Sequence, residues 1–264
     1  MSRIAAAFKE LRLTGRKGFI PFLTAGDPDL ATTSLLLLEL QAAGSTLIEL
    51  GVPFSDPMAD GPVIQRSSER ALKNGVGLQQ ILETVGNLGD RLTTPIVLFT
   101  YFNPLLQFGP DRLARLARAN NIDGVLVTDV TPEEAANLVN QLRASDLDMI
   151  FLVAPTSTDD RLALITKQAS GFIYAVSRTG VTGERDSVSA EAEELVGRVR
   201  TFSDLPVAVG FGISTVEQVR DVQRYADAAV VGSAIVAEIE KLNRDPHLVS
   251  RLGAFVRNLV GSSH

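Results

Sequence analysis

The sequence predicts a single (β/α)8 TIM barrel, a fold in which eight parallel strands alternate with helices. Short, almost continuously apolar runs recur eight times along the chain, and stretches with apolar residues at helical spacing lie between them. Apolar runs without polar alternation are typical of parallel strands that are buried on both faces. The chain has 264 residues, and such barrels commonly form one domain of roughly 250 residues. We therefore expect one domain spanning residues 1–264.

The eight apolar runs are the predicted strands, and their number favours a closed barrel. An open doubly wound sheet is the alternative, but such sheets usually have fewer strands. The predicted strands are Gly18–Thr24, Thr46–Leu50, Pro95–Thr100, Gly124–Thr128, Met149–Ala154, Phe172–Val176, Pro206–Gly210 and Ala228–Val231.

The predicted helices lie between these strands, and several begin with proline or acidic residues, which favour a first helical turn. An extra helix precedes the first strand, because Ile4, Phe8 and Leu11 have helical spacing. The other predicted helices are Leu30–Ala43, Gln79–Leu88, Pro110–Ala119, Pro132–Ala144, Asp159–Gln168, Ala190–Thr201, Val216–Tyr225 and Leu248–Val260.

Two connections are long, and both follow a predicted strand. One runs from Gly51 to Gln79 after the second strand, and the other runs from Ser177 to Ser189 after the sixth. Barrel active sites lie at the C-terminal ends of the strands, where both loops begin. We expect the second loop, which contains Arg178, to be a mobile lid that excludes water when it closes. The alternative for Arg178 is a solvated surface charge.

The composition excludes several classes of function. Lys and Arg number 25 against 31 Asp and Glu, and this net charge of −6 disfavours binding to nucleic acid or to anionic membranes. The chain has no cysteine, and its two histidines, His247 and His264, lie near the C-terminus. We therefore expect no disulfide, no metal site and no histidine-based triad. No apolar run is long enough to span a membrane and no signal peptide is evident, so we expect a cytoplasmic protein.

Glu49 is a charged residue inside an apolar predicted strand. If it shares a face with Leu47, its side chain points into the barrel near the C-terminal mouth. A carboxyl group among apolar neighbours loses solvation, so its pKa should rise. Such a pKa suits a general acid that works near neutral pH. The alternative is an ion-paired glutamate at the end of the strand.

Asp60 follows in the next loop, directly before Gly61. Aspartates before glycine are usually turn residues, so the position alone favours a structural role. Its place on the same barrel face as Glu49 makes it the second candidate carboxylate. Asp56, before a proline, has the same structural alternative, and Asp129 after the fourth strand is either another polar site group or a helix cap.

Glycines lie at the C-terminal ends of three neighbouring strands. Gly183 is in the loop after the sixth strand, Gly210 and Gly212 end the seventh, and Gly232 ends the eighth. Loops after strands seven and eight of a barrel often bind phosphate, because backbone N–H groups can approach the anion closely. A helix that begins at Ser233 would add its positive dipole end. The alternative is that these glycines only allow tight turns at the strand ends.

Two aromatic residues, Phe22 and Tyr174, fall on predicted strands. Aromatic side chains on buried strands belong to the core more often than to a binding site. The positions alone therefore favour core packing and leave substrate contact as the alternative.

The segment Leu47–Gly61, with Glu49 and Asp60, resembles the signature of the tryptophan synthase alpha chain family. The resemblance implies a retro-aldol lyase that splits indole-3-glycerol phosphate into indole and glyceraldehyde 3-phosphate. It also implies that this chain needs no cofactor, and that indole passes to a beta subunit that carries pyridoxal phosphate, in an α2β2 tetramer. The resemblance covers essentially the whole chain in order, and it continues at Phe19–Pro28, Ser177–Gly183, Gly210–Ser214 and Val231–Val236.

The same resemblance implies roles for individual residues. Glu49 matches the residue that protonates C3 of the indole ring, and Asp60 matches the carboxylate that stabilises positive charge at the indole nitrogen. Pro53 and Asp56 match the surface that touches the beta subunit. Residues of the lid are matched by Arg178 and Thr182. Positions that match substrate contacts are Phe22, Leu126, Leu152, Tyr174, Thr182, Gly183, Gly210, Phe211, Gly212, Gly232 and Ser233.

The sequence departs from the family pattern at two places. After the fourth strand the family usually has Asp, an apolar residue and Pro, whereas here Thr131 separates Val130 from Pro132 on the partner-facing side. Phe102 stands where smaller residues are common. Two alternatives to the lyase subunit are a stand-alone lyase that releases free indole and a regulatory subunit without turnover. The second would have lost Glu49 or Asp60, and both are present.

Overall fold

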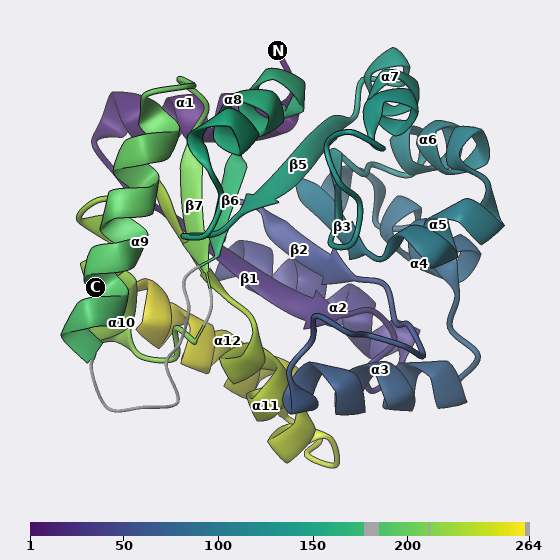
Figure 1. Ribbon diagram of the computed structural model, residues 1–264. Helices are drawn as coiled ribbons and strands as arrows, with labels where there is room; N and C mark the ends of the chain where they lie inside the picture. The colour runs from purple at the N-terminus through teal and green to yellow at the C-terminus, as the bar shows by residue number, and fades with distance from the viewer. Residues whose placement is uncertain (177–184, 211, 262–264) are drawn as a thin grey trace.

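The predicted closed barrel is present in the computed structural model, which describes residues 1–176, 185–210 and 212–261, the side chains of 185–189 excepted. Within these residues, eight parallel strands follow one another around the barrel in chain order, and β8 pairs with β1 (Figure 1). All eight predicted strands are confirmed, with small shifts at their ends. The strands are β1 (Gly18–Thr24), β2 (Ile48–Gly51), β3 (Ile96–Thr100), β4 (Gly124–Val127), β5 (Asp148–Val153), β6 (Ile173–Val176), β7 (Val207–Gly210) and β8 (Ala228–Val231).

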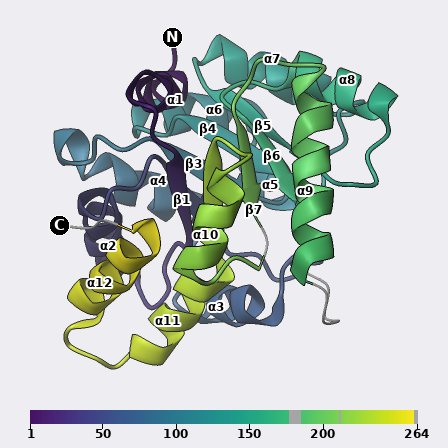
Figure 2. The ribbon, with the colours of Figure 1, turned by 90° about the vertical axis from the view of Figure 1, so that its left-hand side faces the viewer.

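Helices surround the barrel on its outside, as Figures 1 and 2 show together. A short 3-10 helix, η1, covers Gly89–Arg91. The α-helices are α1 (Arg3–Thr14), α2 (Leu30–Ala42), α3 (Pro62–Lys73), α4 (Leu78–Gly86), α5 (Phe102–Phe108), α6 (Pro110–Ala119), α7 (Ala136–Ala144), α8 (Asp159–Gln168), α9 (Arg185–Arg200), α10 (Val216–Gln223), α11 (Ser233–Leu242) and α12 (Leu248–Val260).

Several helix predictions need correction. The long connection after β2 contains α3, and α5 follows β3, although neither was predicted. Helix α7 begins at Ala136 rather than at Pro132, because the N–H of Glu134 bonds to the Thr131 carbonyl in a tighter turn. Helix α9 begins at Arg185 rather than at Ala190, since no glycine or proline interrupts residues 185–189.

The N-terminal helix α1 closes one end of the barrel interior. It begins after Ser2, whose Oγ accepts a hydrogen bond from the Ala5 N–H at 3.2 Å. Ile4 and Phe8 are buried in the interior cluster, and the Phe8 ring lies 5.8 Å from the Phe172 ring between centroids. The predicted extra helix is therefore confirmed, and the opposite, C-terminal end of the barrel is the one that the β-to-α loops surround.

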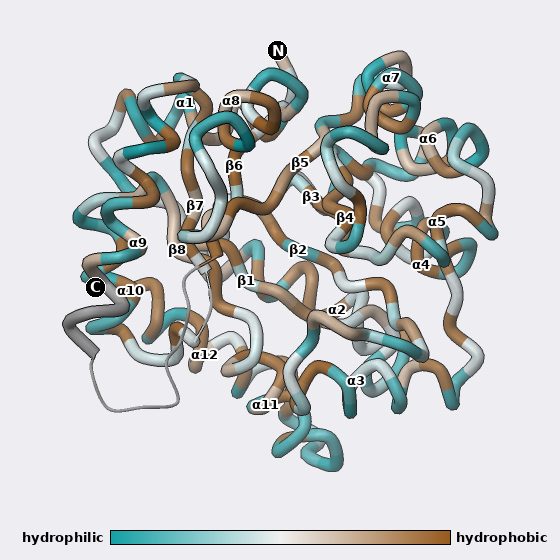
Figure 3. Tube along the Cα trace, in the orientation of Figure 1, coloured by the Kyte–Doolittle hydropathy of each residue, from teal (hydrophilic) through white to brown (hydrophobic). Residues whose placement is uncertain are grey.

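A second, larger apolar cluster fills the layer between the strands and the outer helices. Leu36, Leu37 and Leu40 of α2 are fully buried in it. Figure 3 shows the same division, with apolar residues along the strands and hydrophilic residues on the outer sides of the helices. None of the helices in the described part of the chain has both the length and the apolar run needed to cross a lipid bilayer.

Candidate active site

Glu49 lies on β2 and points into the barrel. It is in register with Phe22 of β1 and Val97 of β3, both of which are buried. Only 1% of the residue is exposed, and its Oε1 atom has no hydrogen-bond partner among the described residues. Burial alone raises the pKa of the Glu49 carboxyl from 4.5 to about 8, because the charged form loses hydration. The predicted inward orientation is confirmed, no salt bridge to Glu49 is present among the described residues, and Glu49 holds a proton at neutral pH.

Asp60 lies in the loop between β2 and α3. Burial raises its pKa from 3.8 to about 6, and a hydrogen bond with Tyr101 opposes that rise. The loop backbone is held on both sides, since Asp60 N–H donates to the Pro57 carbonyl at 3.1 Å and Gln65 Nε2 donates to the Asp60 carbonyl at 2.9 Å. At neutral pH Asp60 is therefore mostly ionised while Glu49 is mostly protonated, which gives one end of the barrel both an acid and an anion.

Tyr101 follows β3 directly and was not identified as a site residue from the sequence. Its hydroxyl accepts a hydrogen bond from the Ala59 N–H at 3.0 Å and keeps its own proton to donate to Asp60. Burial first, and then the charge of Asp60, raise the pKa of Tyr101 to about 12, so the phenol stays protonated. The sequence could have indicated Tyr101 as a site residue, because it directly follows a predicted strand and so lies at the C-terminal end of the barrel.

Tyr174 lies on the inner face of β6, in register with Leu152 and Ala208. Burial raises the pKa of Tyr174 well above 10, and the charge of Glu49 adds to the rise, so the two side chains lie within electrostatic reach. A Cβ atom built on Gly210 would lie 2.2 Å from the Tyr174 hydroxyl. Gly210 is therefore a site of close approach, where the absence of a side chain lets the tyrosine reach across to β7.

Apolar side chains line the same end of the barrel interior. Phe22 packs edge-on against Phe99, with ring centroids 5.3 Å apart and an interplanar angle of 78°. A Cβ atom on Gly51 would lie 2.5 Å from the Phe22 ring, so β2 leaves room for that ring. Leu126 is fully buried in the interior cluster and the half-buried Leu152 packs against it. This lining can hold a flat apolar ring.

The start of α11 offers an anion site. The predicted helix start at Ser233 is confirmed, and it follows directly after β8 and Gly232. The N–H groups of Ser233 and Ala234 have no carbonyl partner inside the helix, because the first turn of every helix lacks one. Gly212, after β7, is exposed and has a positive φ of 69°. Donors without partners inside the helix and the positive end of a helix dipole favour a phosphate group here.

Four predicted site residues lie outside the described residues. They are Arg178, Thr182 and Gly183 in the loop after β6, and Phe211 after β7. The predicted lid covers Ser177–Ser189, but residues 185–189 form the start of α9 rather than a loop, and the mobility of the lid stays a prediction.

Pro53 and Asp56, the predicted partner contacts, lie in the loop after β2. Pro53 is buried, whereas Asp56 is exposed and accepts a hydrogen bond from Ser55 Oγ at 2.6 Å. Met58, in the same loop, is 94% exposed. This loop therefore presents both a charge and a large apolar side chain on the surface next to Asp60.

Asp129 serves as a helix cap, which was one of its two predicted roles. Its Oδ1 accepts a hydrogen bond at 2.6 Å from the N–H of Phe102, the first residue of α5. The inserted Thr131 donates from its hydroxyl to Glu134 Oε2 at 2.8 Å. The two departures from the family pattern, Phe102 and Thr131, therefore lie in the neighbouring segments that follow β3 and β4.

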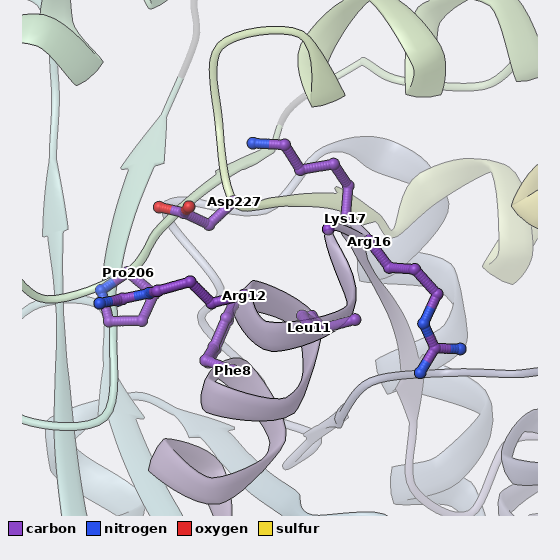
Figure 4. Close-up of a pocket in the computed structure, with 8 residues that line it drawn as sticks. Phe8, Leu11, Arg12, Arg16, Lys17, Pro206 and Asp227 are labelled. Atoms are coloured by element: carbon purple, nitrogen blue, oxygen red, sulfur yellow. The ribbon is translucent and has the colours of Figure 1, made fainter.

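The opposite end of the barrel has a hollow of about 190 Å³ between α1 and the starts of β7 and β8 (Figure 4). Two of its cations have partners, since Arg16 pairs with Glu10 at 3.2 Å and Lys17 Nζ donates to the Ala226 carbonyl at 2.8 Å. This face of a barrel usually contributes to stability rather than to chemistry. In the part of the chain that the structure describes, no group of three His, Cys, Asp or Glu side chains could hold a metal ion.

Comparison with known proteins gives one consistent family. The family model described as "Tryptophan synthase alpha chain" matches residues 8–262. The tryptophan synthase alpha chain of Citrifermentans bemidjiense is 51% identical over 259 residues, which cover 98% of this chain and 97% of that protein. The corresponding chain of Solibacter usitatus is 48% identical with the same coverage.

Solved structures agree with the sequence relatives. Tryptophan synthase subunit alpha from Legionella pneumophila superposes with a TM-score of 0.91 at 33% identity, covering 99% of this chain and 98% of that one. Tryptophan synthase from M. tuberculosis, in its aminoacrylate-bound form, gives a TM-score of 0.88 at 36% identity, with 98% of each chain covered.

Proposed function

Because the chain belongs to the tryptophan synthase alpha chain family, we propose that Glu49 and Asp60 catalyse the reaction of that family in this chain. The chain is a lyase that cleaves indole-3-glycerol phosphate into indole and glyceraldehyde 3-phosphate. The observation that supports the assignment of Glu49 is its burial, with Oε1 unpaired among the described residues, which keeps the carboxyl protonated on the inner face of the barrel.

Glu49 is the proposed general acid. Its carboxyl donates a proton to C3 of the indole ring, and the ring then carries a positive charge that is shared with its nitrogen. A general acid works best when its pKa lies near the working pH, and a pKa of about 8 meets that condition. An ordinary glutamate would be ionised at pH 7 and would have no proton to give.

Asp60 is the proposed partner of the indole nitrogen. With a pKa of about 6 it is ionised at neutral pH, so it can accept a hydrogen bond from the ring N–H. That bond strengthens as the ring becomes positive, and an interaction that is stronger in the transition state accelerates the step. Tyr101 positions the carboxylate by donating to it, while the Ala59 N–H holds the tyrosine hydroxyl.

Cleavage completes the reaction without any outside reagent. The bond between indole C3 and the side-chain carbon breaks, and its electron pair neutralises the ring. The hydroxyl on that carbon loses its proton and becomes the aldehyde of glyceraldehyde 3-phosphate. We assign that proton to the carboxylate of Glu49, which returns to its acid form, so protons and electrons balance over one turnover.

The remaining candidates bind the two ends of the substrate. The indole ring lies against Phe22, Leu126, Leu152 and Tyr174, whose side chains line the inner face beside Glu49. The phosphate takes the N-terminus of α11, where backbone donors are free of helical partners. Residues proposed for this phosphate end are Gly183, Gly210, Phe211, Gly212, Gly232 and Ser233.

The lid and the partner surface complete the proposal. Arg178 and Thr182 belong to the lid, which closes over the bound substrate. The loop with Pro53 and Asp56 docks on a beta subunit, which holds pyridoxal phosphate and receives the indole in an α2β2 assembly. This chain itself uses no cofactor. The substrate of this biosynthetic lyase is a water-soluble phosphate ester. The proposed location of the chain is therefore the cytoplasm.

Indole release from indole-3-glycerol phosphate, with and without a tryptophan synthase beta subunit, tests this function. We expect slow release by the purified chain alone and a rise of many-fold on adding the beta subunit. Fast release that the beta subunit does not change would favour the stand-alone lyase. Absence of release in both conditions would favour the regulatory subunit and overturn the catalytic assignment.

A further inference from the structure

Arg70 of α3 makes an ion-pair network that joins three elements of the barrel. Its guanidinium binds Asp27 with two bonds of 2.7 Å, from Nε to Oδ1 and from Nη2 to Oδ2. Its third nitrogen, Nη1, donates to Glu240 Oε1 of α11, also at 2.7 Å. Asp27 lies in the turn after β1 and is 2% exposed. One side chain thus holds α3 against both β1 and α11.

Glu240 is shared with a second arginine. Arg66, one turn earlier on α3, binds both Glu240 oxygens at 2.8 and 2.7 Å. These hydrogen bonds lower the pKa of Glu240 to about 2, so it stays ionised over the working range. Arg66 is half exposed and does not contact Asp27, whereas Arg70 is mostly buried and contacts both carboxylates. The two arginines therefore differ in burial and in the link to the turn after β1, which Arg70 makes and Arg66 does not.

Directional contacts of this kind also hold helix α3 at other positions. Its buried residues are Ser67, Ser68 and Ala71, which are too small to interlock with neighbours. The Ser67 and Thr24 hydroxyl oxygens lie 2.6 Å apart, and Asn74 Nδ2 donates to a turn carbonyl at 2.6 Å. Small buried side chains leave a helix free to slide, while hydrogen bonds of fixed length hold it at one position.

The position of α3 relative to α11 affects substrate binding, because a proposed binding group lies at the N-terminal end of each helix. Asp60 comes two residues before the first residue of α3, and the proposed phosphate site is the first turn of α11. The substrate is held at both places at once, by its ring nitrogen and by its phosphate. A bridge between α3 and α11 thus controls the distance between the two ends of the binding site.

We propose that Arg70 is a positioning residue that sets the spacing between Asp60 and the phosphate-binding start of α11. This inference rests on the proposed function, because it takes the two ends of the site from it. Arg70 touches neither end. It acts by keeping both ends at the separation that one substrate molecule needs, so that binding at one end favours binding at the other.

The test compares a two-ended ligand with its two halves. Calorimetry measures the binding of indole alone, of inorganic phosphate alone, and of indole-3-propanol phosphate, an analogue that lacks the hydroxyl needed for cleavage. The affinity of the whole ligand divided by the product of the two fragment affinities is the effective concentration that the site imposes. A general loss of structure lowers the fragment affinities, whereas a change of spacing lowers this ratio.

Arg70→Gln is expected to lower the ratio at least about tenfold, because displacements of about 1 Å can cost about 100-fold. Lys73→Gln, at an exposed position of the same helix, is the matched control and should leave the ratio within about twofold. Arg66→Gln removes two bonds to Glu240 but keeps the link between Arg70 and Asp27, so it should lower the ratio less than Arg70→Gln does. Arg70→Lys should restore only part of it, since an ammonium group cannot bind Asp27 with two parallel bonds and also reach Glu240. Glu240→Gln leaves the Asp27 pair intact, and it should also lower the ratio by weakening the α11 arm.

An unchanged ratio in folded Arg70→Gln would overturn the inference. Should that variant fail to fold, Glu240→Gln decides, and an unchanged ratio there overturns it equally. Failure of the proposed function has a different signature, because the unaltered chain would then bind the analogue no more tightly than its fragments and would release no indole.

Discussion

Glu49 makes this chain less stable as the pH rises, and Glu49→Gln should remove that dependence. The pKa of the folded state, about 8, lies above the ordinary value of 4.5 that an unfolded chain should show. The folded state thus binds the proton more tightly, so the stability that this proton contributes is complete below pH 4.5 and is lost as the pH rises to 8. Each pH unit within that window costs about 1.4 kcal/mol. The total stability lost between pH 4.5 and pH 8 is about 4 kcal/mol.

Urea unfolding of the two proteins at pH 6 and at pH 8 measures this effect and avoids the sequence isoelectric point near 5.1. The glutamine amide is also buried without a partner, and this lowers the stability of the variant by an amount that does not depend on pH. The quantity to follow is therefore the difference in unfolding free energy between the two proteins, and how it changes from pH 6 to pH 8. We expect the difference in unfolding free energy to shift by about 2 kcal/mol in favour of glutamine between the two pH values. Glu193→Gln, at an exposed position of α9, is the control and should show no shift. Parallel pH profiles for the unaltered chain and the Glu49→Gln variant would refute the reasoning.

Three further substitutions test the surroundings of the site. Tyr101→Phe removes the hydrogen bond that lowers the pKa of Asp60, so the acidic limb of the kcat profile should move to higher pH; an unmoved limb would contradict the contact. Gly210→Ala places a methyl group against the Tyr174 hydroxyl and should lower kcat/KM, and adding Tyr174→Phe should restore part of the activity; no restoration would exclude that clash. Asp129→Ala removes the cap of α5 and should cost about 1 kcal/mol in urea unfolding. A loss near zero would show that the cap contributes little.

The strands were predictable because burial on both faces leaves an uninterrupted apolar run in the sequence. Helix α3 was not, since its buried face consists of Ser67, Ser68 and Ala71 and therefore has no apolar periodicity. The same feature explains why its position depends on Arg70 and Asp27 rather than on interlocking side chains. Helix α5 is short and contains a proline, so it also lacked the usual helical signal.

The candidate site was predictable to the extent that a residue conflicts with its local pattern. Glu49 was found from the sequence because a carboxylate inside an apolar strand is unusual. Tyr101 conflicts with nothing around it, and its role appears only when β3 and the loop before α3 come together in space. The partners of Arg70 lie 43 and 170 residues away along the chain, and no local pattern can indicate such contacts.

The proton on Glu49 is the central claim, and the indole release rate of Glu49→Gln tests it most directly. Glutamine keeps the shape of the side chain and has no proton to donate, so kcat should fall by about 100-fold to 10,000-fold. Binding of indole-3-propanol phosphate should remain within a few fold of that of the unaltered chain, which would show that the site is intact. A Glu49→Gln protein that binds the analogue normally and keeps most of its turnover would contradict the account.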